Sequence, residues 1–258
     1  MNSIIKKIPK PIRIILVLAF WVGVWWLIAR SVNKELLIAS PDRVARRLLE
    51  LAQEKEFYTT VLLSVLRILT GFLAAVFAGV VTGIATAKIG LLDELISPLL
   101  SIIKATPVAS FIILALVWID RQSIPSFISF LMVLPIIQGN VSAGLKNTPN
   151  ELIEMTRVYK LSRWKRITKL YFPTVLPYFT AGCKTSLGLA WKAGVAAEVL
   201  CTPKMSIGKQ LYESKLYMET VDVFTWTIAV IVISVIIEKL LMWSVGKLSS
   251  TRKREADI

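Results

Sequence analysis

Charged residues in a mostly apolar segment are the side chains of this chain best placed to take part in chemistry. Lys184, Lys192 and Glu198 lie within residues 175–200, where small and apolar residues predominate, and Lys184 can extend to the cytoplasmic side. Inside a bilayer such a charge costs at least about 2.5–3.5 kcal/mol, so it normally faces either an aqueous path or an opposite charge. Lys192 could therefore attract an anionic solute, or it could join helices through a pair with Glu198 or another acid.

Residues that support enzyme chemistry are scarce. The 258 residues include no His, which removes imidazole bases, Ser-His-Asp triads and His-ligated metals. The two cysteines, Cys183 and Cys201, are too far apart for a CxxC metal pair. The G-x-x-x-x-G-K-[ST] phosphate-binding loop does not occur either. We therefore expect no catalytic residue, no metal and no cofactor, and any ATP-driven step requires a second polypeptide.

The composition indicates an integral membrane protein. Hydrophobic residues make up 55% of the chain, and 31 Lys and Arg against 17 Asp and Glu give a net charge of +14. The mean hydropathy is +0.65. A soluble nucleic-acid binder would explain the charge but not the apolar excess, whereas a membrane protein with basic loops on one side explains both. We therefore expect contact with a lipid bilayer and none with nucleic acid.

Six apolar segments each reach the roughly 17 residues that a transmembrane helix needs. They are residues 12–29, 60–87, 98–119, 124–144, 175–200 and 223–245. The predicted fold is an all-α membrane protein with six transmembrane helices and both termini on one side. If that side is the cytoplasm, the inner segments carry 17 Lys and Arg and the outer segments 10, which agrees with the positive-inside rule.

Prolines, small residues and one arginine add detail to these spans. Pro107 and Pro135 interrupt the third and fourth spans, and the resulting kinks would suit helices around a cavity that opens and closes, although such kinks are common. Arg67, near the outer end of the second span, is interpreted as an interfacial anchor. Rows of small residues allow close helix packing, either within an ordinary bundle or at a moving or dimerising interface. The rows are Gly71, Ala75, Gly79, Gly83 and Ala87, and Gly182, Ser186, Ala190 and Gly194.

The loop between spans four and five, residues 147–173, is the most basic loop and has a helical pattern. Its apolar residues recur at spacings of three and four, which predicts two short amphipathic helices joined by a bend. Ser162 is the predicted N-cap of the second helix. The pair could lie on anionic lipid or form a docking surface for a soluble partner, and the pattern favours neither.

Five segments, in order, resemble the permease subunits of binding-protein-dependent (type I) ABC importers. Glu154-Met155-Thr156, followed by Lys160 and Pro173, is similar to the EAA…G…LP loop of that family. Pro149–Glu154 is similar to P-x-E-L-x-E. The other segments are Ile38–Pro41, Ser64–Phe72, and Ala190–Trp191 with Val195–Glu198. The resemblance covers about residues 36–245, and the branch resembled carries nitrate, sulfonates, taurine and thiamine-precursor pyrimidines.

The resemblance implies that the loop forms cytoplasmic coupling helices that dock on a separate ATPase. The implied docking residues are Glu151, Glu154, Met155, Thr156, Lys160, Leu161 and Ser162. Lys160 stands where the family has glycine, which suits a bend with positive φ, and a side chain there costs about 1 kcal/mol or more. Either the bend takes another geometry, or the ATPase has a matching acidic groove.

The resemblance also implies the function and partners. The chain would be the transmembrane subunit of an ATP-driven importer for a small anionic solute, in the cytoplasmic membrane of a bacterium with both termini inside. It would act with two ATPase subunits, a second permease copy and an extracytoplasmic binding protein that meets the outer segments 40–56 and 204–222. The candidate translocation path comprises Lys192, Glu198, Pro107 and Trp191. The alternative is a self-contained secondary transporter or channel, which would transport without ATP.

Overall fold

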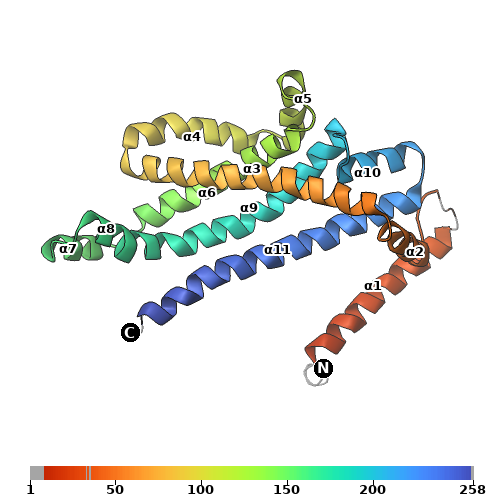
Figure 1. Cartoon of the computed structure of the whole chain (residues 1–258), viewed down its shortest axis with the longest axis horizontal. Helices are drawn as coiled ribbons and strands as arrows, with labels where there is room; N and C mark the ends of the chain where they lie inside the picture. The colour runs from red at the N-terminus through yellow and green to blue at the C-terminus, as the bar shows by residue number, and fades with distance from the viewer. Residues whose placement is uncertain (1–8, 33, 35, 257–258) are drawn as a thin grey trace. The chain divides into compact units, whose positions relative to one another are not determined.

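The computed structural model describes residues 9–32, 34 and 36–256, and these form helices and turns with no β-strand among them. The predicted all-α fold is confirmed (Figure 1). In chain order the helices are α1 Lys10–Val32, α2 Pro41–Leu51, α3 Lys55–Lys88, α4 Gly90–Ala105, α5 Val108–Trp118, α6 Ile124–Lys146, α7 Asn150–Val158, α8 Arg163–Arg166, the π-helix η2 Ile167–Tyr171, α9 Phe172–Cys201, α10 Ile207–Leu216 and α11 Thr220–Ala256.

Two compact units divide the chain. The first contains the chain up to Thr59 together with Gln210–Val230, and the second contains Thr60–Lys209 and the chain from Ile231 onward. Helices α3, α10 and α11 therefore begin in one unit and end in the other.

The first unit is held together by an ion pair and by stacked aromatic rings. Arg47 of α2 donates to both carboxylate oxygens of Asp222 in α11, from Nε at 2.8 Å and from Nη2 at 3.0 Å. The hydrogen bond with Asp222 raises the pKa of Arg47 above its usual value, so the guanidinium keeps its charge. Trp25 of α1 stacks on Phe224 with ring centroids 5.7 Å apart. These contacts join α1, α2 and the start of α11.

The second unit is built around α6 and α9, which pack along each other, with α3 pressed closely against α6. Glycines permit this approach: a Cβ at Gly71 would strike the backbone carbonyl of Ser126, and one at Gly79 would lie 2.8 Å from the Cβ of Ile137. A Cβ at Gly194 of α9 would likewise lie 2.5 Å from Ile68 Cγ1. At these positions the small residues of both rows serve helix packing within the chain.

The predicted third span, residues 98–119, is not a single helix. Helix α4 ends at Ala105, α5 begins at Val108, and the two axes are bent by 106°. The break follows from Pro107, which has no N–H to donate and forces Thr106 into an extended conformation (φ −81°, ψ 133°). Pro135 has no such effect, because α6 continues through it from Ile124 to Lys146.

Length and hydropathy show which of the described helices could cross a membrane. Four of the described helices are long and apolar enough to cross a membrane, namely α1, α3, α6 and the first part of α11, and the bent pair α4–α5 adds a fifth if it counts as one span. Helix α9 has 30 residues, about 45 Å, but it does not reach the same hydropathy. The membrane crossing predicted for α9 therefore stays a prediction. The helix is long enough to span a bilayer, but its composition alone does not indicate a transmembrane helix.

Close glycine packing generates the first testable prediction. Gly71→Ala should lower the melting temperature of the detergent-solubilised protein, because the added methyl group meets backbone that cannot rotate away and overpacking costs about 1–3 kcal/mol. Gly139→Ala is the matched control: Gly139 lies inside α6, nothing lies within 4 Å of its added Cβ, and alanine favours the helix by up to about 1 kcal/mol. Equal melting temperatures for the two variants would contradict this packing.

Candidate functional site

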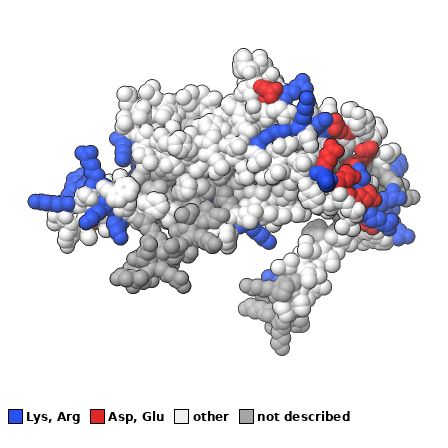
Figure 2. All heavy atoms as spheres, viewed as in Figure 1, with Lys and Arg blue, Asp and Glu red and all other residues white. Residues whose placement is uncertain are grey.

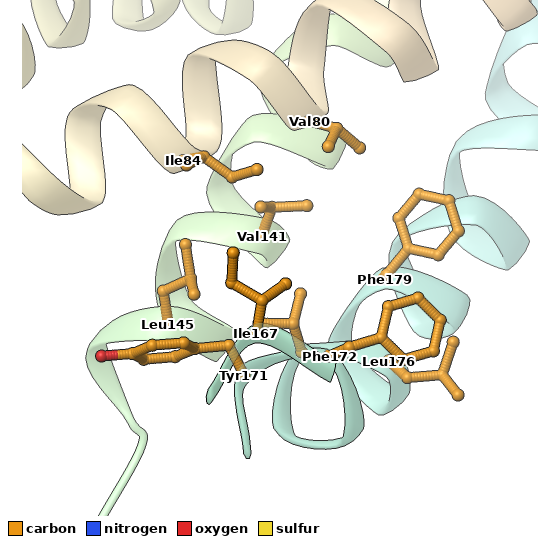
Figure 3. A pocket seen from close by; sticks show the side chains of 10 residues that line it. Val80, Ile84, Val141, Leu145, Ile167, Tyr171, Phe172, Leu176 and Phe179 are labelled. Atoms are coloured by element: carbon orange, nitrogen blue, oxygen red, sulfur yellow. The ribbon is translucent and has the colours of Figure 1, made fainter. Parts of the chain in front are cut away.

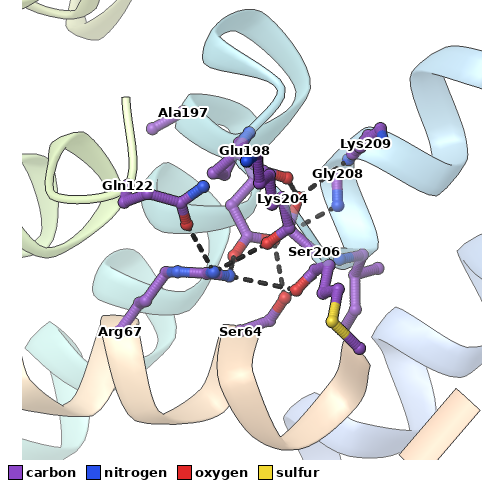
Figure 4. A network of polar contacts seen from close by, with 12 residues as sticks. Ser64, Arg67, Gln122, Ala197, Glu198, Lys204, Ser206, Gly208 and Lys209 are labelled. Atoms are coloured by element: carbon purple, nitrogen blue, oxygen red, sulfur yellow. Dashed lines mark hydrogen bonds and ion pairs between the residues drawn. The ribbon is translucent and has the colours of Figure 1, made fainter. Parts of the chain in front are cut away.

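A buried carboxylate joins three helices of the second unit. Glu198, near the end of α9, is 0% exposed. Its Oε2 accepts hydrogen bonds from Ser64 Oγ of α3 at 2.9 Å and from the Gly208 N–H of α10 at 3.2 Å (Figure 4). Its other oxygen, Oε1, lies 3.7 Å from Nη1 of Arg67. The carboxylate is thus held by a hydroxyl, by an amide at a helix N-terminus, where the helix dipole favours negative charge, and by a guanidinium.

Arg67 is the centre of this network. It lies one turn after Ser64 on α3, and its side chain is only 15% exposed. Nη2 donates to Gln122 Oε1 at 2.6 Å and to the Lys204 carbonyl at 2.8 Å, and Nη1 donates to the Met205 carbonyl at 3.1 Å (Figure 4). The interpretation of Arg67 as an interfacial anchor stays a prediction, and the structure adds hydrogen bonds to protein groups that it did not include.

The turn between α9 and α10 brings these groups together. Thr202 and Met205 both have left-handed backbones, with φ of 48°, and the chain reverses there. Ser64 Oγ accepts the Ile207 N–H at 2.9 Å, which fixes the start of α10 on α3. A Cβ at Gly208 would fall on the backbone and Cβ of Glu198, so glycine is required at this approach.

The network also decides one alternative left open for Lys192. Glu198 pairs with Arg67 and faces the protein interior, whereas Lys192 is exposed on the other side of α9. A Lys192–Glu198 pair does not form. Within the described part of the chain, Lys192 is exposed and makes no hydrogen bond or ion pair.

The second candidate site is the knob, which we define as α7, the bend at residues 159–162, and α8. Two short helices joined by a bend were predicted here. The first is α7, whereas the second is not a separate helix, because α8 is the four-residue start of a helix that continues into α9. Ser162 is confirmed as an N-cap, with its Oγ accepting the Lys165 N–H at 3.4 Å. In Figure 1 the knob forms the end of the second unit beyond α6 and α9. The helix after α8 continues through the π-helical turn η2 into α9.

The bend is a Schellman motif with lysine at the glycine position. The Leu161 N–H donates to the Thr156 carbonyl and the Lys160 N–H donates to the Arg157 carbonyl, each at 3.0 Å. Lys160 has φ of 47°, in the left-handed region. The possibility that the bend avoids positive φ is therefore excluded, and Lys160 carries the cost of about 1 kcal/mol or more that glycine would avoid.

The predicted docking residues divide into exposed and buried members. Thr156 is buried, and its hydroxyl donates to the Ile153 carbonyl at 2.7 Å, so it shapes the helix end and presents no surface. Leu161 is half-buried. The exposed members are Glu151, Glu154, Met155, Lys160 and Ser162. On the face shown in Figure 2, Lys and Arg gather over this end of the second unit.

Comparison with known proteins connects these features to one family. Residues 71–253 match the model of the binding-protein-dependent transport system inner membrane component. The match includes the knob, Lys192 and Glu198. The chain belongs to this family. It is accordingly a transporter permease subunit and a multi-pass inner-membrane protein.

Several characterised permeases are similar over most of their length. The nitrate import permease protein of Leptolyngbya laminosa is 26% identical over 83% of this chain and 77% of its own, and the taurine transport system permease protein of Escherichia coli is 25% identical over 84% and 80%. The bicarbonate transport system permease protein of Synechocystis sp. is 28% identical over 62% of this chain and 58% of its own.

The four candidate path residues occupy different surroundings in this permease. Lys192 and Pro107 are exposed, whereas Glu198 and Trp191 are buried. Lys192 shares its exposed face of α9 with Lys184 and Ala196. The structure thus separates Glu198, which belongs to the buried network, from Lys192, which does not.

The permease also has an apolar cavity that sequence reasoning did not predict (Figure 3). It has a volume of about 310 Å³ and lies between α3, α6 and the η2–α9 junction. Its lining residues are Val80, Ile84, Val141, Leu145, Ile167, Tyr171, Phe172, Val175, Leu176 and Phe179. No charged side chain lines it, so the cavity is unsuited to an anionic solute. None of the four path candidates lies on its wall.

Removing the arginine of the buried network should destabilise the permease, because a buried charge is left without its partner. Arg67→Met leaves the Glu198 carboxylate buried without its cation, which should destabilise the permease by about 3–5 kcal/mol. The double variant Arg67→Met/Glu198→Gln removes that charge and should recover part of the loss, measured as the melting temperature in detergent.

The control for this cycle is Lys192→Met, which removes an equal charge from an exposed position and should leave stability nearly unchanged. A melting temperature for Arg67→Met equal to that of Lys192→Met would show that the Arg67–Glu198 pair does not support the fold.

Proposed function

We propose that this permease is the transmembrane subunit of an ATP-driven importer that moves a small anionic solute into a bacterial cell. The observation that carries the proposal is the family match over residues 71–253. Relatives are named as permeases for nitrate, bicarbonate and taurine, and each of these solutes carries an anionic group. The solute is received from an extracytoplasmic binding protein that docks on the outer segments.

The proposed topology has six spans with both termini in the cytoplasm. Four apolar helices and the bent pair α4–α5 supply five crossings, and α9 supplies the sixth. The low hydropathy of α9 is compatible with this role, because its polar Ser186 and Glu198 are buried against other helices. This topology places the knob on the inner side, where it docks on an ATPase subunit, two of which serve each complex.

The exposed face of α9 is proposed to face the translocation path or a second permease copy. Lys184, Lys192 and Ala196 lie on this face, and the described residues of the second unit leave it exposed. A lysine in the membrane with no acidic partner in the described part of the chain is costly, and a passing anion would offset that cost. Within this proposal a pair of permeases forms the path, and Lys192 provides its cationic site.

Uptake into proteoliposomes tests the proposal. Vesicles with the permease, its ATPase and its binding protein should accumulate radiolabelled nitrate, bicarbonate or taurine only when the ATPase can hydrolyse ATP. Vesicles without the ATPase serve as the control. Accumulation driven by an ion gradient without ATPase would favour a secondary transporter or a channel and would overturn the proposal.

Lys192→Ala should reduce uptake of the transported anion at least about tenfold, because the path loses its attracting charge. ATPase association with the permease should not change, since Lys192 lies on α9 and the knob precedes it. Lys184→Ala is the matched control and should have a smaller effect, because the Lys184 side chain can extend toward the membrane surface. Unchanged uptake and unchanged solute preference in Lys192→Ala would remove Lys192 from the path.

A further inference from the structure

The knob presents a strained lysine at its tip. Lys160 adopts φ of 47°, a conformation that non-glycine residues other than Asn and Asp rarely take. Its side chain is exposed and makes no hydrogen bond or ion pair within the described residues. The fold therefore bears a backbone cost at a residue whose ammonium group has no hydrogen bond or ion pair among the described residues, and backbone strain of this kind concentrates at functional positions.

Charge is ordered along the knob. Glu151 and Glu154 lie on the first turns of α7, and the exposed charged residues that follow in the knob are cationic. These cations are Arg157, Lys160, Arg163 and Lys165. One end of the knob is thus acidic, and the bend with the start of α8 is basic. A partner surface with the complementary order of charges would bind the knob in a defined orientation, because complementary charges fix register and exclude wrong partners.

Exposed apolar side chains accompany the cations around the bend. Val158, Tyr159 and Trp164 are 78%, 69% and 74% exposed. Tyr, Trp and Arg are the residue types that dominate binding energy at protein–protein interfaces. A helix lying on anionic lipid has a polar face rich in Lys and Arg, and the acids Glu151 and Glu154 would be repelled by that lipid. The knob therefore fits a protein groove better than a lipid surface.

We propose that the ATPase groove receiving the knob is acidic where it meets Lys160 and the start of α8, and basic where it meets Glu151 and Glu154. This inference rests on the proposed function, because it takes the ATPase subunit as the partner. Lys160 then anchors the complex: its left-handed backbone directs the ammonium outward, and a groove carboxylate pairs with it.

The test measures the dissociation constant of the ATPase from the detergent-solubilised permease at several salt concentrations. Lys160→Asn keeps a residue that tolerates the left-handed bend but removes the charge, so binding should weaken several-fold and depend less on salt. Lys160→Glu should weaken binding at least about tenfold, and replacing a groove acid of the ATPase by lysine should restore it. Melting temperatures of both variants verify that the permease remains folded.

Lys215→Glu is the matched control, because it reverses an equal charge on exposed α10 far along the chain from the knob, and it should bind as the unmodified permease does. Equal dissociation constants for all variants would overturn the inference while leaving the proposed function in place. Failure of the unmodified permease to bind any ATPase would instead overturn the proposed function.

Limited trypsin digestion separates a lipid partner from a protein partner, because Arg157, Lys160 and Arg163 are cleavage sites. In vesicles, the ATPase should protect these bonds whether the lipid is neutral or anionic. Protection by anionic lipid without the ATPase would assign the knob to the membrane surface and would contradict an acidic groove.

Discussion

Burial of the Glu198 carboxylate is the constraint on which the second unit depends. A charge removed from water is tolerated only when polar groups around it are fixed in place. Ser64, Arg67 and the Gly208 amide supply these groups from α3 and α10. Because each of them is also tied to a neighbouring element, the carboxylate joins the ends of α3 and α9 to the turn that begins α10. The left-handed residues of that turn and the glycine at its close approach follow from the same requirement.

The opposite end of the second unit is organised by backbone geometry. The Schellman motif at Lys160 ends α7 sharply and allows Ser162 to start α8, which continues through η2 into α9, so that α7 and the bend lie at this end of the bundle. Helices α6 and α9 connect this end to the buried network, since the knob lies between them in sequence and they pack along each other. The proposed function, in which ATP-driven closure at the knob moves a path, needs such a continuous, closely packed connection. The glycine contacts between α3 and α6 add to it.

Sequence patterns predicted the features that depend on local periodicity. Hydropathy predicted the long apolar helices, and spacings of three and four with a serine cap predicted α7 and the start of α8. The pairing of Arg67 with Glu198 was missed because it joins residues far apart in sequence, and a lone arginine near a span end suits an anchor equally well. Pro107 and Pro135 look alike in sequence, yet a helix ends just before Pro107, whereas α6 continues through Pro135. Trp191, a candidate for the path, is buried. Its burial was not predicted, because helix periodicity alone does not tell which face of a helix its neighbours cover.

Photo-crosslinking from the tip of the knob tests the central claim most directly. A benzophenone amino acid placed at Tyr159, which is exposed beside Lys160, would be activated in native membranes and the adduct identified by mass spectrometry. The account predicts an adduct with an ATPase subunit, within a stretch of that subunit rich in Asp and Glu. Adducts with lipid alone, in membranes where the ATPase is present, would contradict it.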